Sequence, residues 1–263
     1  MDGLEEKIFF ITGAARGIGF ATAKLLGEYG AKVVLTDYSE AVEQAAQSLR
    51  NNGVDAIGFQ LDVRNVEEVE KVMEKVETEY GPVFGVVPAA GITQSGPAIT
   101  MSQEAWQNVI DINLTGTFSV CRAAARKMLE RKAGRIVMIG SVGSFGGQSG
   151  RVNYVATKWA IAGLTKSLAI EWGSNGLRVN AVCPNAVNTD MYKKGVPEEF
   201  SKNVIEDRVP YGRVAEVDEV AKAIVFLLSD AAAYINGVLL PVDGGLTAGF
   251  FTHRQGRDLA LKP

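Results

Sequence analysis

Tyr154 and Lys158 are the residues whose types and spacing point most directly to chemistry, because they lie one helical turn apart in NYVATKWA. Both side chains then leave the same face of a helix. A phenol is a poor base at neutral pH, since its reference pKa is about 10, but a neighbouring ammonium favours the phenolate. Such a pair could exchange a proton with a substrate oxygen. A chance YxxxK is not rare in a chain with seven tyrosines, so the pair needs supporting residues.

Ser141 is the first supporting residue. It directly follows the expected strand from Arg135 to Ile139, and ligands of α/β sheets bind at the carboxyl ends of strands. Its hydroxyl could hydrogen-bond a substrate oxygen while Tyr154 protonates it, so that two donors stabilise the developing charge. Ser144 is a rival donor in the same loop.

Asn113 in DINLTG is the second supporting residue. A buried amide there could hold a water that links Lys158 to solvent. The alternative is a helix irregularity in which the asparagine side chain bonds its own backbone. The sequence alone leaves both interpretations open.

A glycine-rich loop follows the first apolar run, in TGAARGIG. Gly13, Gly17 and Gly19 permit a tight turn and let a pyrophosphate approach backbone N–H groups where a helix begins. Arg16 and Ile18 lie between them. An isolated glycine trio is as often an ordinary turn, but its position after the first strand favours a dinucleotide site.

Asp37 ends the second strand, at a distance from the glycine loop that suits a carboxylate bound to the adenosine ribose of NAD. A 2′-phosphate at that place would be repelled, although Arg16 could face one. We therefore expect NAD, with NADP as the less favoured cofactor. Asp62 and Val63 follow the third strand and could bracket the adenine, or Asp62 could cap the next helix.

These residues need a scaffold of alternating strands and helices, and the hydrophobic pattern predicts one. Gly53, Gly81 and Gly134 are placed as helix-ending signals. The expected strands are residues 7–12, 31–36, 56–61, 83–88, 135–139, 178–183 and 238–241, and the expected helices are 18–29, 40–51, 66–80, 104–131, 153–172 and 217–228.

Strands that are apolar on both faces and joined by helix-length crossovers predict a parallel sheet flanked by helices on both faces. Right-handed connections make this an α/β, Rossmann-type, doubly wound sheet of seven expected strands. We expect one domain over residues 1–263, because no linker or composition shift divides the chain. The irregular piece at residues 184–216 follows a strand's carboxyl end and is a candidate substrate lid.

Composition excludes several other classes of function. The net charge of −3 offers no basic surface for nucleic acid or an anionic membrane, and the apolar runs are too short to span a bilayer. One histidine and two separated cysteines cannot form a Cys/His zinc cluster, so we expect no metal. The acidic N-terminus does not resemble a secretory signal, and a cytoplasmic location is expected.

The motifs TGAARGIG, NLTG, YVATK, RVNAVCP and VDGGLT, together with Ser141, resemble the short-chain dehydrogenase/reductases over residues 7–247. The resemblance implies an NAD(P)-dependent oxidoreductase acting on CH–OH groups, and a homotetramer built on the helices that carry Asn113 and Tyr154. It implies that Tyr154 is the acid/base and that Ser141 orients the substrate oxygen. It also implies that Lys158 binds the nicotinamide ribose and that Asn113 holds a relay water.

The sequence departs from this family at two places. The family's NNAG after strand four is PAAG here, so only the backbone near Ala90 and Gly91 can line the cofactor. The family's Pro-Gly after strand six is Pro-Asn, which places Asn185 near the nicotinamide and the substrate or leaves it as a turn residue. Val187 and Thr189 match family positions that hold the carboxamide.

The leading hypothesis is interconversion of a secondary alcohol and a ketone with NAD, where the alcohol is a polyol, a cyclic alcohol or a hydroxy acid. The first alternative is a 3-oxoacyl-carrier-protein reductase using NADPH, which Asp37 disfavours and the basic cluster on residues 122–132 supports. The second alternative is a non-catalytic nucleotide-binding sensor, which the presence of Asn113, Ser141, Tyr154 and Lys158 together disfavours. Candidate substrate contacts are Gln94, Ser141, Gly143, Phe145, Gln148, Tyr154, Asn185, Met191 and Tyr192.

A C-terminal extension at residues 247–263 lies beyond the last family motif and contains Phe250, Phe251 and His253. Two adjacent aromatic rings are costly to leave in water. We therefore expect this segment to pack against a neighbouring subunit, with a frayed terminus as the alternative.

Overall fold

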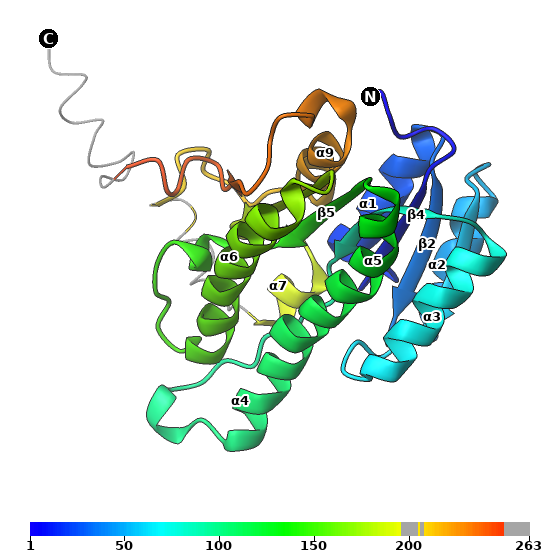
Figure 1. Ribbon diagram of the computed structural model, residues 1–263. Helices are drawn as coiled ribbons and strands as arrows, with labels where there is room; N and C mark the ends of the chain where they lie inside the picture. Colours follow the sequence, from blue (N-terminus) through cyan, green and yellow to red (C-terminus); the bar gives the residue numbers. More distant parts are fainter. Residues whose placement is uncertain (196–204, 206–207, 250–263) are drawn as a thin grey trace, which may run out of the picture.

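The computed structural model describes residues 1–195, 205 and 208–249, and its centre is one seven-stranded parallel sheet (Figure 1). The strands lie in the order β3-β2-β1-β4-β5-β6-β7. Their bounds are β1 Ile8–Thr12, β2 Lys32–Asp37, β3 Ala56–Gln60, β4 Val83–Pro88, β5 Gly134–Ile139, β6 Leu177–Pro184 and β7 Leu239–Val242.

Helices cover both faces of this sheet, as expected. The helices α3, α5 and α6 pack on one face, and α1, α2 and α9 pack on the other. The α-helices of the described residues are α1 Gly17–Glu28, α2 Ala41–Arg50, α3 Val66–Glu79, α4 Gln103–Ile110, α5 Thr117–Arg131, α6 Val152–Gly173, α7 Asp190–Gly195 and α9 Val217–Leu228.

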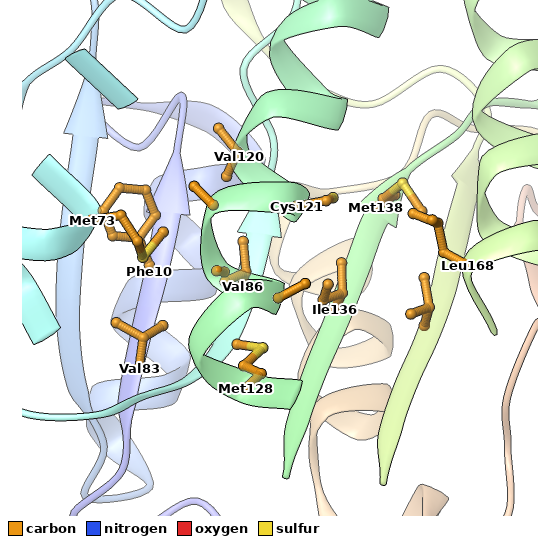
Figure 2. Close-up of a cluster of buried hydrophobic side chains, with 14 of the residues drawn as sticks. Phe10, Met73, Val83, Val86, Val120, Cys121, Met128, Ile136, Met138 and Leu168 are labelled. Carbon is orange, nitrogen blue, oxygen red and sulfur yellow. The ribbon is translucent and has the colours of Figure 1, made fainter. Parts of the chain in front are cut away.

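The alternation of side chains along each strand explains why the strands are apolar on both faces. Phe10 of β1 packs with α3 and α5 in one core cluster, where Figure 2 shows it near Met73, whereas Phe9 and Ile11 belong to the opposite cluster. All three are fully buried. Val120 and Met128 of α5 close the first cluster over the sheet (Figure 2). The predicted doubly wound α/β fold is confirmed.

The strand order reverses direction between β1 and β4, and this switch point determines where a ligand can lie. In open α/β sheets, ligands bind in the crevice outside the carboxyl ends of the strands at such a point. The glycine loop follows β1, Ser141 follows β5 and Asn185 follows β6. The fold therefore brings the predicted site segments to one rim.

The structure differs from the expected elements in two segments. The helix expected at residues 104–131 is divided into α4 and α5 by a π-helical segment, Asp111–Gly116. The candidate lid at 184–216 contains the helix α7, and its residues 196–204 and 206–207 lie outside the described residues. Phe250, Phe251 and His253 of the C-terminal extension lie outside them too. Within the described residues, no helix is long and apolar enough to cross a membrane.

Candidate active site

The glycine loop between β1 and α1 packs closely against the loop after β4. Gly13 has a φ of +63°, and a Cβ there would lie 2.8 Å from the backbone of Ala90. A Cβ on Gly19 would lie 2.4 Å from the carbonyl oxygen of Gly13. Only glycine fits this turn.

The start of α1 fits the pyrophosphate of a dinucleotide. Gly17, its first residue, has a φ of +61°, and a Cβ there would meet only Thr189 Cγ2 at 3.7 Å. Among the described residues, no side chain caps the N-terminus of α1. The backbone N–H groups of its first turn are therefore able to receive an anion, which supports the dinucleotide interpretation.

Asp37 lies where β2 meets this loop, and its carboxylate is held in place by backbone groups. One carboxylate oxygen accepts the N–H of Ala15 at 3.1 Å, and the other accepts the N–H of Ser39 at 2.9 Å. Arg16, the cation that could face a 2′-phosphate, is 3.5 Å from the carboxylate of Asp190. The loop thus holds an oriented carboxylate next to an arginine that already has an acidic partner.

Asp62 and Val63 follow β3 on the same rim. Asp62 accepts hydrogen bonds from the backbone and the guanidinium of Arg64, with a shortest distance of 2.6 Å, and this guanidinium holds the pKa of Asp62 below its usual value. The cap of α3 is Asn65, which accepts the N–H of Glu68, so Asp62 does not cap that helix. Val63 is buried.

The two serines after β5 have different partners. Ser141 Oγ accepts the N–H of Gly143 at 3.1 Å, which uses a lone pair and not the hydroxyl proton. Ser144 Oγ donates to the carbonyl of Lys158 at 2.7 Å and accepts the N–H of Ser141 at 3.3 Å. Because the proton of Ser144 is used within the protein, Ser141 is the better placed of the two to donate to a substrate.

We expect Ser144→Ala to lower the free energy of unfolding by about 1–3 kcal/mol, because it leaves the buried Lys158 carbonyl without this donor. Chemical denaturation measures the change. Ser149→Ala, at an exposed position in the same loop, is the control and should be near neutral. Equal stabilities of the Ser144→Ala protein and the unchanged protein would contradict the structural role of Ser144.

Tyr154 and Lys158 lie on the same face of α6, as their spacing predicts. Lys158 is 7% exposed, and its Nζ donates to the carbonyl of Ile139 at 2.8 Å. This Nζ lies 5.3 Å from the centre of the Tyr154 ring. The Arg151 guanidinium carbon lies 5.1 Å from the same ring centre. The tyrosine ring is therefore flanked by two cations, only one of which the sequence pattern had indicated.

Asn113 is buried within the π-helical segment, a type of irregularity that is frequent at functional sites. Its side chain does not bond its own backbone. Oδ1 accepts the N–H of Ile92 at 2.8 Å, and Nδ2 donates to the Ile92 carbonyl at 2.9 Å. Asn113 thus ties α4 and α5 to the loop after β4.

One cavity of about 1170 Å³ lies over this rim. Of the predicted site residues, it is lined by Ile18, Gly91, Ser141, Phe145, Gln148, Tyr154, Lys158, Asn185, Val187, Thr189, Met191 and Tyr192. Gly13, Arg16, Gly17, Gly19, Asp37, Asp62, Val63, Ala90, Gln94, Asn113 and Gly143 are not among its lining residues. Lining residues that the sequence did not indicate include Ser95, Arg151, Ile205, Arg208, Leu246 and Thr247.

Neither cysteine is prepared for thiolate chemistry. Burial raises the pKa of Cys121 to about 12, and it also raises the pKa of Cys183. Among the described residues, the titratable groups that line the cavity are Tyr154 and Tyr192 with the cations Arg151, Lys158 and Arg208. This arrangement is suited to proton transfer at a substrate oxygen.

Known proteins resemble this chain over nearly its whole length. A family model described as Enoyl-(Acyl carrier protein) reductase matches residues 13–247. The 3-oxoacyl-[acyl-carrier-protein] reductase FabG of Pseudomonas aeruginosa is 38% identical over 244 residues, covering 92% of this chain and 98% of the relative. The cis-4-hydroxycyclohexanecarboxylate dehydrogenase of Sinomonas cyclohexanicum is 38% identical over 248 residues, covering 94% and 99%.

Solved structures of dehydrogenases are also similar to this chain over nearly its whole length. A gluconate 5-dehydrogenase from Burkholderia cenocepacia, in complex with NADP and tartrate, superposes with a TM-score of 0.90 at 33% identity and covers 95% of this chain and 97% of its own. The relatives favour the reductase alternative over the secondary-alcohol hypothesis, and they support a nucleotide cofactor without supporting NAD in particular. The resemblance seen in the motifs is confirmed: the chain belongs to the short-chain dehydrogenase/reductase family of oxidoreductases.

Proposed function

We propose that the chain reduces the 3-oxo group of an acyl thioester to a 3-hydroxyl group, with Tyr154 as the proton donor. The observation that carries the proposal is the meeting of Ser141, Tyr154 and Lys158 in one cavity, in a chain that is 38% identical to a 3-oxoacyl-[acyl-carrier-protein] reductase. A bound nicotinamide dinucleotide supplies the hydride. Ser141 and Tyr154 donate hydrogen bonds to the ketone oxygen, and Lys158 stabilises the phenolate that remains.

The cavity also suits an acyl chain. Phe145, Met191, Ile205 and Leu246 contribute apolar lining to the cavity that the hydroxyl donors Ser141 and Tyr154 also line. An apolar pocket with a few convergent polar groups orients a substrate of this kind.

The basic cluster on α5, which the sequence indicated as a docking surface for a carrier protein, supports that role less strongly in the structure. The basic cluster on α5 is paired with acids of α3, because Arg122 and Arg126 both lie 3.2 Å from Glu70 and Arg131 lies 2.7 Å from Glu77. These pairs reduce the positive charge that a carrier would meet. The proposal therefore rests on the relatives and the cavity.

The second candidate is oxidation of a hydroxy acid or cyclic alcohol with NAD. It is favoured by the carboxylate of Asp37, which faces the position of the adenosine ribose in dinucleotide sites of this kind. Sequence similarity to the cis-4-hydroxycyclohexanecarboxylate dehydrogenase supports the same candidate. For the cofactor we propose NAD(H), on the ground of Asp37 alone.

The test follows the absorbance of reduced nicotinamide. Acetoacetyl thioester is offered with NADH and NADPH, and hydroxy acids, polyols and cyclic alcohols are offered with NAD and NADP. We expect thioester reduction to have the highest kcat/KM. Turnover of a secondary alcohol without thioester reduction would replace the first candidate with the second, and cofactor binding without turnover of any substrate would favour the sensor.

We propose that the chain assembles as a homotetramer through the outer sides of α5 and α6. Phe118, Trp159 and Ile170 are exposed there by 36%, 53% and 83%, and exposed apolar clusters mark contact surfaces. Ile170→Glu is expected to give a smaller species in analytical ultracentrifugation. A monomeric unsubstituted protein would contradict the proposal.

A further inference from the structure

All the charged side chains among the described residues that line the cavity are cationic. Of the described lining residues, Arg151, Lys158 and Arg208 carry positive charge, and no aspartate or glutamate lines the cavity with them. This sign differs from that of the whole chain, which carries a net charge of −3. A cavity lined by one sign of charge concentrates ligands of the opposite sign.

Most of the arginines that the structure describes already have an acidic partner. Arg50 lies 2.6 Å from Glu43, and Arg135 lies 2.7 Å from Asp230. Within the described part of the chain, neither Arg151 nor Arg208 has a carboxylate within 4 Å, and both line the cavity. The described residues therefore supply no acidic partner for either Arg151 or Arg208.

Arg151 is held by weak contacts with neutral groups. Its Nε is 3.5 Å from Ser95 Oγ, and its Nη1 is 3.3 Å from Gln148 Oε1. Both contacts are long for hydrogen bonds to a guanidinium, which prefers bidentate carboxylates at shorter distances. The guanidinium is thus positioned without being satisfied.

The place of Arg151 limits the ligand to a short acid. Its guanidinium carbon is 5.1 Å from the centre of the Tyr154 ring, so an anion bound to it lies beside the phenol that serves the reacting oxygen. The carboxylate and the carbinol carbon of the substrate must then be separated by only a few bonds.

We propose that Arg151, assisted by Arg208, binds the carboxylate of short oxo and hydroxy acids, so that the enzyme also turns these acids over as free anions. This further activity rests on the proton transfer proposed for Tyr154. Reduction adds a hydride, supplied by reduced nicotinamide dinucleotide, to the ketone carbon and a proton to its oxygen. The carboxylate remains unchanged.

The experiment compares three forms of one acyl group: acetoacetate, methyl acetoacetate and S-acetoacetyl-N-acetylcysteamine. We expect the unsubstituted enzyme to prefer acetoacetate to the methyl ester. Arg151→Gln should lower kcat/KM for acetoacetate by roughly ten- to a hundredfold, and that for the methyl ester far less, because a charge-assisted hydrogen bond is lost only with the acid. Arg151→Lys should restore part of the preference. Arg126→Gln, on the exposed side of α5, is the matched control and should keep it.

Equal losses for acid and ester in Arg151→Gln would overturn the proposal and make Arg151 a positioning residue for Tyr154. Equal use of acid and ester by the unsubstituted enzyme would overturn it as well. Calorimetric binding of acetoacetate to the Tyr154→Phe protein with cofactor present gives a readout without turnover. If the double variant Tyr154→Phe, Arg151→Gln bound acetoacetate with the same Kd as Tyr154→Phe alone, the result would count against the acid site. Thioester turnover tests the proposed function separately. An enzyme that reduces acetoacetate but not the thioester would contradict the thioester reductase proposal and leave the acid site standing.

Discussion

Tyr154→Phe is expected to lower kcat by roughly a thousandfold with any substrate, the largest effect predicted for this protein. Proton transfer by a positioned side chain contributes about 10²- to 10⁴-fold, and phenylalanine has no proton to transfer. The substitution keeps the aromatic ring near Lys158 and Arg151, so both cations retain their contact with it. The measurement is kcat at saturating substrate and cofactor.

The control for this variant must show that the site remains folded and binds its cofactor. Fluorescence titration with reduced nicotinamide dinucleotide should give a Kd within a few-fold of that of the unsubstituted protein. Tyr80→Phe removes a phenol outside the cavity and should leave kcat unchanged. If Tyr154→Phe kept kcat within tenfold, the proton would come from another group, and Ser141 is the other hydroxyl of the predicted site that lines the cavity.

The sheet and the position of the site could be predicted because they follow from local patterns. Strands such as β1 are buried on both faces, and their continuous apolar sequence shows this directly. Once a parallel sheet is predicted, every strand ends at the same rim, so Ser141 and the glycine loop had to lie near each other. The helical spacing of Tyr154 and Lys158 added the third group.

Other features depend on contacts between distant segments. DINLTG is compatible with an ordinary helix, and the π-helical turn accompanies the bonds of Asn113 to Ile92, 21 residues away. Gly134 was expected to end a helix, but Lys132 takes the left-handed conformation with a φ of +54°, and Gly134 lies in β5. A Cβ on Gly134 would lie 2.5 Å from Met128 Sδ, which no local pattern reveals.

Arg151 shows the same limit at the site. A cation three residues before the tyrosine of YxxxK lies about one helical turn away and was a usable signal. What the sequence could not show was that most of the other described arginines have acidic partners while Arg151 lines the cavity without one. That knowledge requires the positions of carboxylates far away along the chain, such as Glu70, which pairs with Arg122.

Asp37→Asn is expected to lower the ratio of kcat/KM with NAD(H) to kcat/KM with NADP(H) by roughly a hundredfold. Two like charges about 4 Å apart near a protein surface repel by about 4 kcal/mol before screening by salt, so the carboxylate opposes a 2′-phosphate strongly. Asparagine keeps an oxygen that can accept the N–H of Ala15 or Ser39. The change therefore removes charge while preserving most of the loop, and steady-state kinetics with both cofactors measure it.

The salt dependence of this ratio, and its response to other substitutions, show whether Asp37 or Arg16 selects the cofactor. If Asp37 selects the cofactor, the gain with NADP(H) should shrink as salt rises, and Asp55→Asn, at an exposed turn before β3, should leave the ratio unchanged. The opposite outcome is a preference for NADP(H), and the similar gluconate 5-dehydrogenase structure contains NADP. An unsubstituted enzyme that prefers NADP(H), and loses that preference in Arg16→Gln, would show that Arg16 leaves Asp190 to bind the phosphate. Asp37 would then serve only to hold the backbone of Ala15 and Ser39, and the cofactor of this site would be NADP(H).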